Sequence, residues 1–230
     1  MTMSSPALDA VLPTSSEVLV FGPQYLAFSP SSAHALRSQL LSSKRFAWAR
    51  ETLQDLHDHW DSVMSALPLL GVLDGPRLLG RLATWLQTDK LEDLPFPLPN
   101  ILLTPLVVVS HLLQYQQLGE ISDHGPEDYL PGISETLGLC TGHLSAAAVS
   151  CSETQSELYH YGAAAIRIAM LVGALVDAKD VSMGVDGRAK SFSVAWDSRN
   201  DSRNLEQIVT DIPQVRLHYP FIVHFLHSTC

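Results

Sequence analysis

The stretch Gly138-Leu139-Cys140-Thr141-Gly142 decides the fold that we expect for this chain. It follows a short apolar run and precedes a segment of small residues, His143 to Ser150. This arrangement is typical of a nucleophile elbow, a sharp strand-to-helix turn that lifts one nucleophilic side chain out of the backbone. Glycines flank such a turn because a side chain at either position would crowd it. The pattern therefore predicts a strand over residues 132–139, a nucleophile at Cys140 and a helix after it.

A thiol at this position is suited to carrying acyl groups. The N-terminus of a helix favours negative charge on an attacking sulfur, and cysteine forms thioesters as covalent intermediates. The chain has three cysteines, Cys140, Cys151 and Cys230. This odd, sparse set does not indicate a disulfide framework and favours a reducing cytoplasmic compartment. Nothing around Cys151 suggests chemistry, so we expect that thiol to be packed in the core.

Composition predicts a globular protein and excludes several partners. Apolar residues make up 46% of the 230 residues and charged residues 17%, which is enough to build a core. The net charge of −10 argues against nucleic acid and anionic membranes as partners. The most apolar segment, Ile101 to Leu113, is shorter than the roughly 20 residues that a membrane span needs. We therefore expect a core helix there and no membrane partner.

The order of expected elements indicates an α/β fold with a parallel sheet. Glu17–Phe21 reads as a buried strand that ends at Gly22-Pro23, and a second strand feeds the elbow. Helices are expected between and after these strands, over residues 33–42, 46–66, 77–87, 101–117 and 156–176. A strand, then helices, then a strand leading into an elbow is the pattern of a parallel sheet.

Three blocks of this sequence resemble a known family. They are Val18 to Gln24, then Asn100 to Tyr115, and finally Thr136 to Ser150 continuing through Ile166–Met170 to Ser191–Trp196. Together they resemble the starter-unit acyl-carrier-protein transacylase domain of fungal non-reducing polyketide synthases. The resemblance implies an α/β-hydrolase-like acyltransferase core with a parallel sheet, plus an incomplete ferredoxin-like small subdomain. It divides the chain into an N-terminal arm (1–16), the core (17–185) and a partial subdomain with a divergent tail (186–230).

The resemblance also implies a reaction and its residues. The Cys140 thiol would take an acyl group from coenzyme A or from a donor synthase, and pass it to the phosphopantetheine arm of an acyl carrier protein. The backbone N–H of Thr141 would donate to the oxyanion, and Gln24 would support a second donor. Acyl-coenzyme A or acyl-phosphopantetheine is a substrate in this reaction, and no tightly bound cofactor or metal is expected.

The chain departs from the family's pattern in two places. Malonyl-type relatives hold a substrate carboxylate with an arginine in the helix after the elbow, where we align Leu171, with Arg167 the nearest arginine. A carboxylate without a fixed cation is poorly held in an apolar pocket, so we expect a neutral acyl group. The family's general-base histidine lies well downstream. We identify no such base here, and His218, His224 and His227 are weak candidates.

Other interpretations stay open at this point. Cys140 could be a buried structural thiol, Gln24 an ordinary turn residue and His111 a satisfied core histidine. Cys140, His143, Cys151 and His160 do not have the spacing of a common zinc signature. The chain could also be a truncated, catalytically impaired relative that acts as a binding module, or a thioester hydrolase, which would need the same missing base.

Overall fold

The computed structural model describes residues 17–24, 28–88, 90, 94–121 and 133–182, and the statements below concern these residues. The chain divides into compact units of residues 1–189 and 190–230, and all described residues belong to the first. The elements, in chain order, are β1 Glu17–Phe21, α1 Pro30–Ser42, η1 Lys44–Phe46, α2 Ala47–Gln54, α3 Leu56–Ala66, η2 Pro68–Val72, α4 Gly75–Thr88, α5 Asn100–Ile121, β2 Ile133–Gly138, α6 Gly142–Ser150 and α7 Gln155–Ser182.

The two strands form a parallel pair, as the sequence predicted. Val18 lies opposite Glu135 and Phe21 opposite Gly138, with one irregularity after Glu17. The Leu139 N–H extends the pairing by donating to the Phe21 carbonyl oxygen at 2.9 Å. Because parallel strands end at the same edge of a sheet, the turn after β1 and the elbow after β2 lie next to each other.

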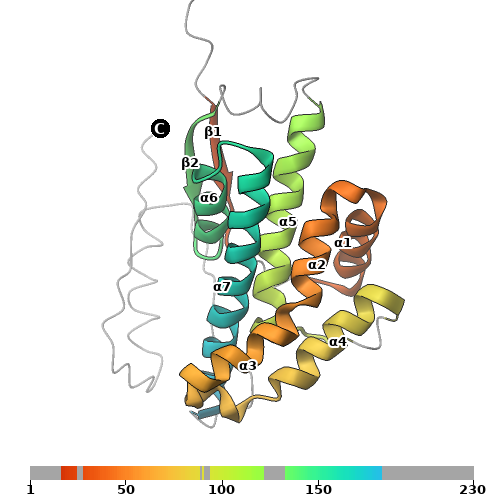
Figure 1. The fold of residues 1–230 in the computed structure, drawn as a ribbon, viewed down its shortest axis with the longest axis vertical. Coiled ribbons are helices and arrows are strands. Elements are labelled where there is room, and N and C mark those ends of the chain that lie inside the picture. The colour runs from red at the N-terminus through yellow and green to blue at the C-terminus, as the bar shows by residue number, and fades with distance from the viewer. Residues whose placement is uncertain (1–16, 25–27, 89, 91–93, 122–132, 183–230) are drawn as a thin grey trace, which may run out of the picture. The chain divides into compact units, whose positions relative to one another are not determined.

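The helices α5 and α7 form the centre of the molecule, side by side and next to the small sheet (Figure 1). The helix α5 is buried along most of its length because it is apolar on nearly all sides, as expected for a core helix. Both helices are long and apolar enough to cross a membrane by length and composition alone. The apolar window of α5 is, however, 72% buried inside the protein, and that of α7 44%.

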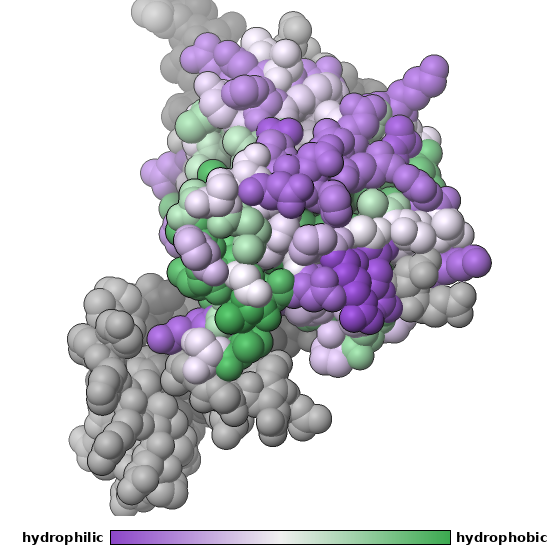
Figure 2. Space-filling model, turned by 60° about the horizontal axis from the view of Figure 1, so that its bottom comes forward, coloured by the Kyte–Doolittle hydropathy of each residue, from purple (hydrophilic) through white to green (hydrophobic). Residues whose placement is uncertain are grey.

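Exposed apolar side chains remain on α7 and on the sheet. On α7 they include Ile168, Val172 and Val176, and on the strands Val18, Val20 and Leu137. Figure 2 shows one face of the molecule on which hydrophobic side chains gather, with mostly polar side chains elsewhere on that face.

Among the helices α1 to α4, α4 packs against α5, α2 and α3 pack against α7, and α1 packs against α2 (Figure 1). They differ from the sequence prediction in the region of residues 46–66. A single helix was expected over residues 46–66, but the structure has a one-residue break at Asp55 between α2 and α3. The Asp55 N–H ends α2 on the Glu51 carbonyl, and the Asp55 carbonyl accepts from the N–H groups of Asp58 and His59 in the first turn of α3. Beyond the break, Trp60 of α3 packs over Gly75, where a β-carbon would collide with the indole ring.

The described part is therefore mostly helical around a two-stranded parallel sheet. The parallel sheet of the predicted α/β class is present, although it is smaller than the fold prediction implied. The expected N-terminal arm (1–16) and partial small subdomain (186–230), with its strand over Ser191–Trp196, lie outside the described residues.

Candidate active site

Cys140 lies at the tip of a turn between β2 and α6, as the sequence predicted. Its φ of 52° is the left-handed conformation, and Cys140 is the non-glycine residue with positive φ among the described residues. That conformation costs a residue with a β-carbon about 1 kcal/mol or more, so the surrounding structure must enforce it. The thiol is exposed. A strained backbone that presents an accessible nucleophile is the geometry of a nucleophile elbow.

The two flanking glycines are required by close backbone contacts. A β-carbon on Gly138 would lie 2.5 Å from the carbonyl carbon of Gly142 and from the α-carbon of His143. A β-carbon on Gly142 would collide with the Phe21 carbonyl oxygen and lie 2.6 Å from that of Gly22. The glycines therefore let α6 begin directly against the end of β1, which brings the turn after β1 to the nucleophile.

The groups around Cys140 hold its backbone and leave one donor available. The Cys140 carbonyl oxygen accepts from the backbone N–H of His143 at 3.1 Å and from the His143 ring Nδ1 at 3.0 Å. The thiol sulfur lies 3.8 Å from the hydroxyl of Thr141. Among the hydrogen bonds of the described residues, none uses the Thr141 backbone N–H. That N–H directly follows the nucleophile, where an oxyanion donor is expected.

The side chain of Gln24 is bound to α5. Its Nε2 donates to the side-chain oxygen of Asn100 at 2.8 Å, and its Oε1 accepts from the Thr104 hydroxyl at 2.8 Å. These two bonds fix the turn that follows β1. The Gln24 side chain is therefore an anchor that ties this turn to the start of α5.

His111 connects α5 to the elbow helix. Its Nδ1 lies 3.1 Å from the hydroxyl of Ser145, which is fully buried in α6, and its ring packs on Phe21 at 5.7 Å between centroids. Burial lowers the pKa of His111 below its ordinary value, which keeps the ring neutral at pH 7. The partly buried pairing agrees with a satisfied core histidine.

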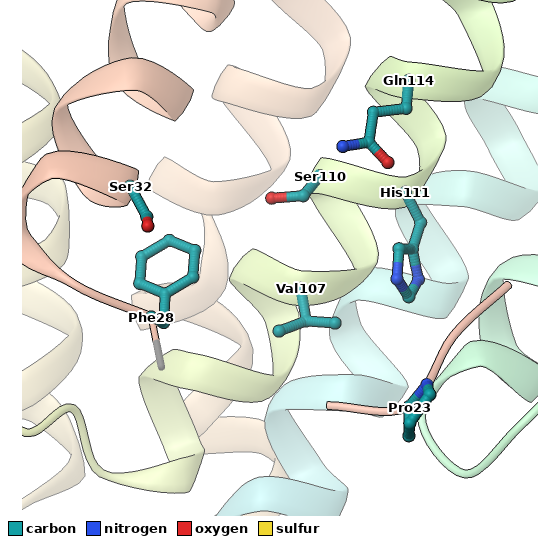
Figure 3. A pocket seen from close by; sticks show the side chains of 7 residues that line it. All are labelled: Pro23, Phe28, Ser32, Val107, Ser110, His111 and Gln114. Atoms are coloured by element: carbon teal, nitrogen blue, oxygen red, sulfur yellow. The ribbon is translucent and has the colours of Figure 1, made fainter. Parts of the chain in front are cut away.

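A cavity of about 220 Å³ lies beside His111. Its wall is formed on α5 by Val107, Ser110, His111 and Gln114, which Figure 3 shows facing Phe28 and Ser32, with Pro23 at another side. Among the described residues, neither a charged side chain nor Cys140 lines it. The cavity therefore adjoins α6 through His111.

The structure separates the other predicted residues from this site or does not describe them. Cys151 was expected to be packed, but it is exposed because it follows the last turn of α6. Leu171 packs against the core, and Arg167 has a buried Nε without a hydrogen-bond partner among the described residues. The base candidates His218, His224 and His227 lie outside the described residues. Where the chain is described, no group of three His, Cys, Asp or Glu side chains could hold a metal.

Sequence reasoning did not single out three residues that support the site. Asn100, Thr104 and Asp177 form hydrogen bonds that link the start of α5 to Gln24 and to α7. Asn100 follows Pro-Leu-Pro at the expected start of a helix, where a polar residue is a cap signal. Asp177 carries no comparable local signal, since its partners are 77 and 76 positions away.

Comparison with known proteins agrees with this geometry. The chain matches the family described as "Starter unit:ACP transacylase in aflatoxin biosynthesis" over residues 26–215. It is 38% identical over 205 residues to the non-reducing polyketide synthase pigA of Monascus ruber, covering 87% of this chain and 8% of that protein. It is 42% identical over 204 residues to the clavatol synthase claF of Penicillium crustosum, covering 86% of this chain and 8% of that protein. The non-reducing polyketide synthase pkdA of Emericella nidulans is 41% identical over 197 residues, covering 83% of this chain and 8% of that protein.

An elbow with an exposed cysteine at its tip is a geometry that suits nucleophilic catalysis. More specifically, the chain belongs to the family of starter-unit acyl-carrier-protein transacylases found in fungal non-reducing polyketide synthases. It spans about 8% of the length of the curated relatives that it matches.

Proposed function

We propose that this chain transfers a neutral starter acyl group through a thioester on Cys140 to the phosphopantetheine arm of an acyl carrier protein. The observation that carries the proposal is the exposed Cys140 in left-handed conformation at the start of α6, in a chain of the transacylase family. The acyl donor is acyl-coenzyme A or the carrier of a donor synthase, and the chemistry needs no tightly bound cofactor.

The reaction consists of two thioester exchanges. The Cys140 sulfur attacks the carbonyl carbon of the donor thioester, and a tetrahedral oxyanion forms. Its collapse breaks the donor's carbon–sulfur bond, and the released thiol takes the proton that Cys140 gave up. The carrier's phosphopantetheine thiol then attacks the Cys140 thioester in the same way and restores the free cysteine. Two half-reactions that share one covalent intermediate give ping-pong kinetics.

The oxyanion would be held by backbone donors. The Thr141 N–H follows the nucleophile and makes no other hydrogen bond among the described residues. The second donor would be the backbone N–H of Gln24, in the turn that the Gln24 side chain anchors to α5. Loss of one such donor typically costs about 3–4 kcal/mol of transition-state stabilisation. The general base stays unassigned.

The preference for a neutral acyl group is supported by Leu171, an uncharged side chain that packs against the core at the position aligned with the carboxylate-binding arginine of malonyl-type relatives. We also propose that residues 17–185 belong to a hydrolase-like acyltransferase core and that residues 186–230 begin a ferredoxin-like subdomain. The protein would work in the cytoplasm. The acyl carrier protein and the acyl donor are the partners of this reaction.

Intact-mass analysis tests the proposal directly. The chain is incubated with acetyl-, hexanoyl- or malonyl-coenzyme A, and then with an acyl carrier protein that bears phosphopantetheine. We expect an adduct of the acetyl or hexanoyl mass that the carrier removes, that Cys140→Ala abolishes and that Cys151→Ala leaves unchanged.

Three results would contradict the proposal or part of it. An adduct that persists in Cys140→Ala excludes Cys140 as the nucleophile. Adduct formation with none of the thioesters excludes the acyl-transfer function and leaves a binding role. Malonyl loading as fast as acetyl loading would overturn the neutral-substrate class and point to Arg167 as the cation.

A further inference from the structure

A continuous line of hydrogen bonds runs from α7 to the turn after β1. The Asp177 Oδ1 accepts from the backbone N–H of Asn100 at 3.0 Å and from its side-chain Nδ2 at 2.8 Å. Asp177 Oδ2 accepts from the backbone N–H of Ile101 at 2.8 Å. The Asn100 side-chain oxygen then accepts from Gln24, and Gln24 in turn accepts from the Thr104 hydroxyl. The far end of the line is therefore the turn beside Cys140.

The carboxylate acts as a helix cap supplied by a different helix. The first N–H groups of a helix lack partners within it, and a side-chain oxygen commonly satisfies them. The residue before α5 is Pro99, which has no polar side chain, so Asp177 fills this role from α7. A carboxylate also interacts favourably with the positive end of the helix dipole.

The two helices meet closely at this point. A β-carbon on Gly173 would collide with the Asn100 carbonyl oxygen. Gly173 lies four residues before Asp177, hence on the same face of α7 one turn away. The close approach and the cap together hold the first turn of α5 against α7.

The charge of Asp177 fixes the direction of every bond in the line. An ionised carboxylate only accepts, so Asn100 must turn its NH₂ toward Asp177 and its oxygen toward Gln24. The oxygen of Asn100 then requires the NH₂ of Gln24, which leaves the Gln24 oxygen for the Thr104 hydroxyl. Burial raises the pKa of Asp177, opposed by the bonds from Ile101 and Asn100, and nearby Asp180 raises it further.

We propose that Asp177 is a positioning residue for acyl transfer, acting through Asn100 to fix the Gln24 turn that supplies the second oxyanion donor. This inference rests on the proposed function of Cys140 and on the assigned role of the Gln24 backbone. Asp177 itself touches neither the thiol nor the substrate in this scheme. Its loss should slow the step that forms the oxyanion and leave other reactions of the same thiol unchanged.

The experiment compares two reactions of Cys140 in Asp177→Asn. The amide oxygen of the new side chain can still accept one hydrogen bond. Its NH₂, however, faces donors of Asn100 or Ile101, so the orientation of the Asn100 amide is no longer enforced. Rapid-quench intact-mass analysis gives the rate constant of Cys140 acylation by acetyl-coenzyme A and its dependence on thioester concentration. Alkylation by iodoacetamide, which forms no oxyanion, is measured on the same samples.

We expect acylation to slow by about tenfold to a hundredfold at saturating thioester, because small displacements of an oxyanion donor are costly. The concentration that gives half-maximal rate should change little, and so should the rate of alkylation. Asp180→Asn, which alters a neighbouring carboxylate on the same helix, is the matched control and should acylate at the wild-type rate.

A double variant tests the direction of the line. In Asp177→Asn combined with Asn100→Asp, the new carboxylate at position 100 again accepts from Gln24, while the amide at 177 donates to it. We expect most of the lost acylation rate to return. Thr104→Val removes a single hydroxyl at the other end of the line and should slow acylation by a few-fold. This variant tests the inference if Asp177→Asn does not fold.

The outcomes separate the two proposals. An unchanged acylation rate in Asp177→Asn or, failing that variant, in Thr104→Val overturns the inference and leaves the function of Cys140 intact. Equal slowing of acylation and alkylation, together with a lower melting temperature, would assign Asp177 a purely structural role and also overturns the inference. A wild-type chain that forms no Cys140 adduct contradicts the proposed function itself.

Discussion

The two ends of α6 each carry an exposed cysteine, and they differ in almost everything else. Cys140 precedes the helix with φ of 52°, between two glycines that allow close backbone contacts. Cys151 follows the helix with φ of −86°, and its N–H completes the last turn on the Ala147 carbonyl. Residue type and accessibility are therefore shared. The candidate for chemistry is distinguished by its backbone conformation and by the end of the helix dipole on which it lies.

The largest expected effect comes from closing the space at the Cys140 end. In Gly142→Ala the new methyl collides with backbone oxygens of Phe21 and Gly22, so we expect a loss of about 2–4 kcal/mol in the free energy of unfolding. Urea denaturation measures it. The matched control is Gly80→Ala in α4, where no atom lies within 4 Å of the new methyl. That change should raise stability by up to about 1 kcal/mol. Equal effects of the two substitutions would show that the elbow is not close-packed.

A smaller effect is expected in the relative reactivity of the two thiols. The two thiols lie at opposite ends of α6, where the helix dipole has opposite signs, an effect typically worth about 0.3–1 kcal/mol for a charge at either end. Iodoacetamide should therefore modify Cys140 about three- to thirtyfold faster, as followed by peptide mass mapping. The difference should vanish in denaturant. Faster modification of Cys151 in the folded chain would contradict the expected effect of the helix dipole on the reactivity of the two thiols.

The smallest effect is the difference in stability between a glycine and an alanine variant, which should have opposite signs at positions 140 and 151. At position 140 glycine adopts the left-handed conformation without strain, so Cys140→Gly should be about 1 kcal/mol more stable than Cys140→Ala. At position 151 the backbone is in the ordinary right-handed region, and Cys151→Gly should be about 0.5–1 kcal/mol less stable than Cys151→Ala. The same order at both positions, measured by thermal or urea unfolding, would mean that Cys140 is not strained.

Most of the features predicted from the sequence are encoded over short distances, whereas the parallel pairing of β1 with β2 was inferred from the order of the elements. The elbow follows from five consecutive residues, because its glycines and its nucleophile act on each other within one turn. The bounds of β1 and of α6 were close to the observed ones for the same reason.

The features that were missed depend on contacts between distant segments. The long helix was expected to end at Val176, since polar residues follow, but α7 continues to Ser182. Asp177 lies within α7, and its carboxylate accepts from the first N–H groups of α5. The role of Gln24 likewise depends on Asn100 and Thr104, more than seventy positions away. The packing of Trp60 on Gly75, which joins α3 to α4, is likewise a contact that no local pattern reveals.

The pairing of Gly173 with Asp177 also fixes the axial register of α7 against α5. If α7 slid by one turn in one direction, Ala169 would bring a methyl to the close contact and Gly173 would leave the first N–H groups of α5 uncapped. In the other direction, Asp177 would enter the close contact and Val181 would replace the carboxylate. Both alternative registers combine a collision with a lost cap. These contacts therefore favour a single axial register of α7, the longest helix of the described chain, against α5. Sliding of α7 along α5 by one turn would break both contacts.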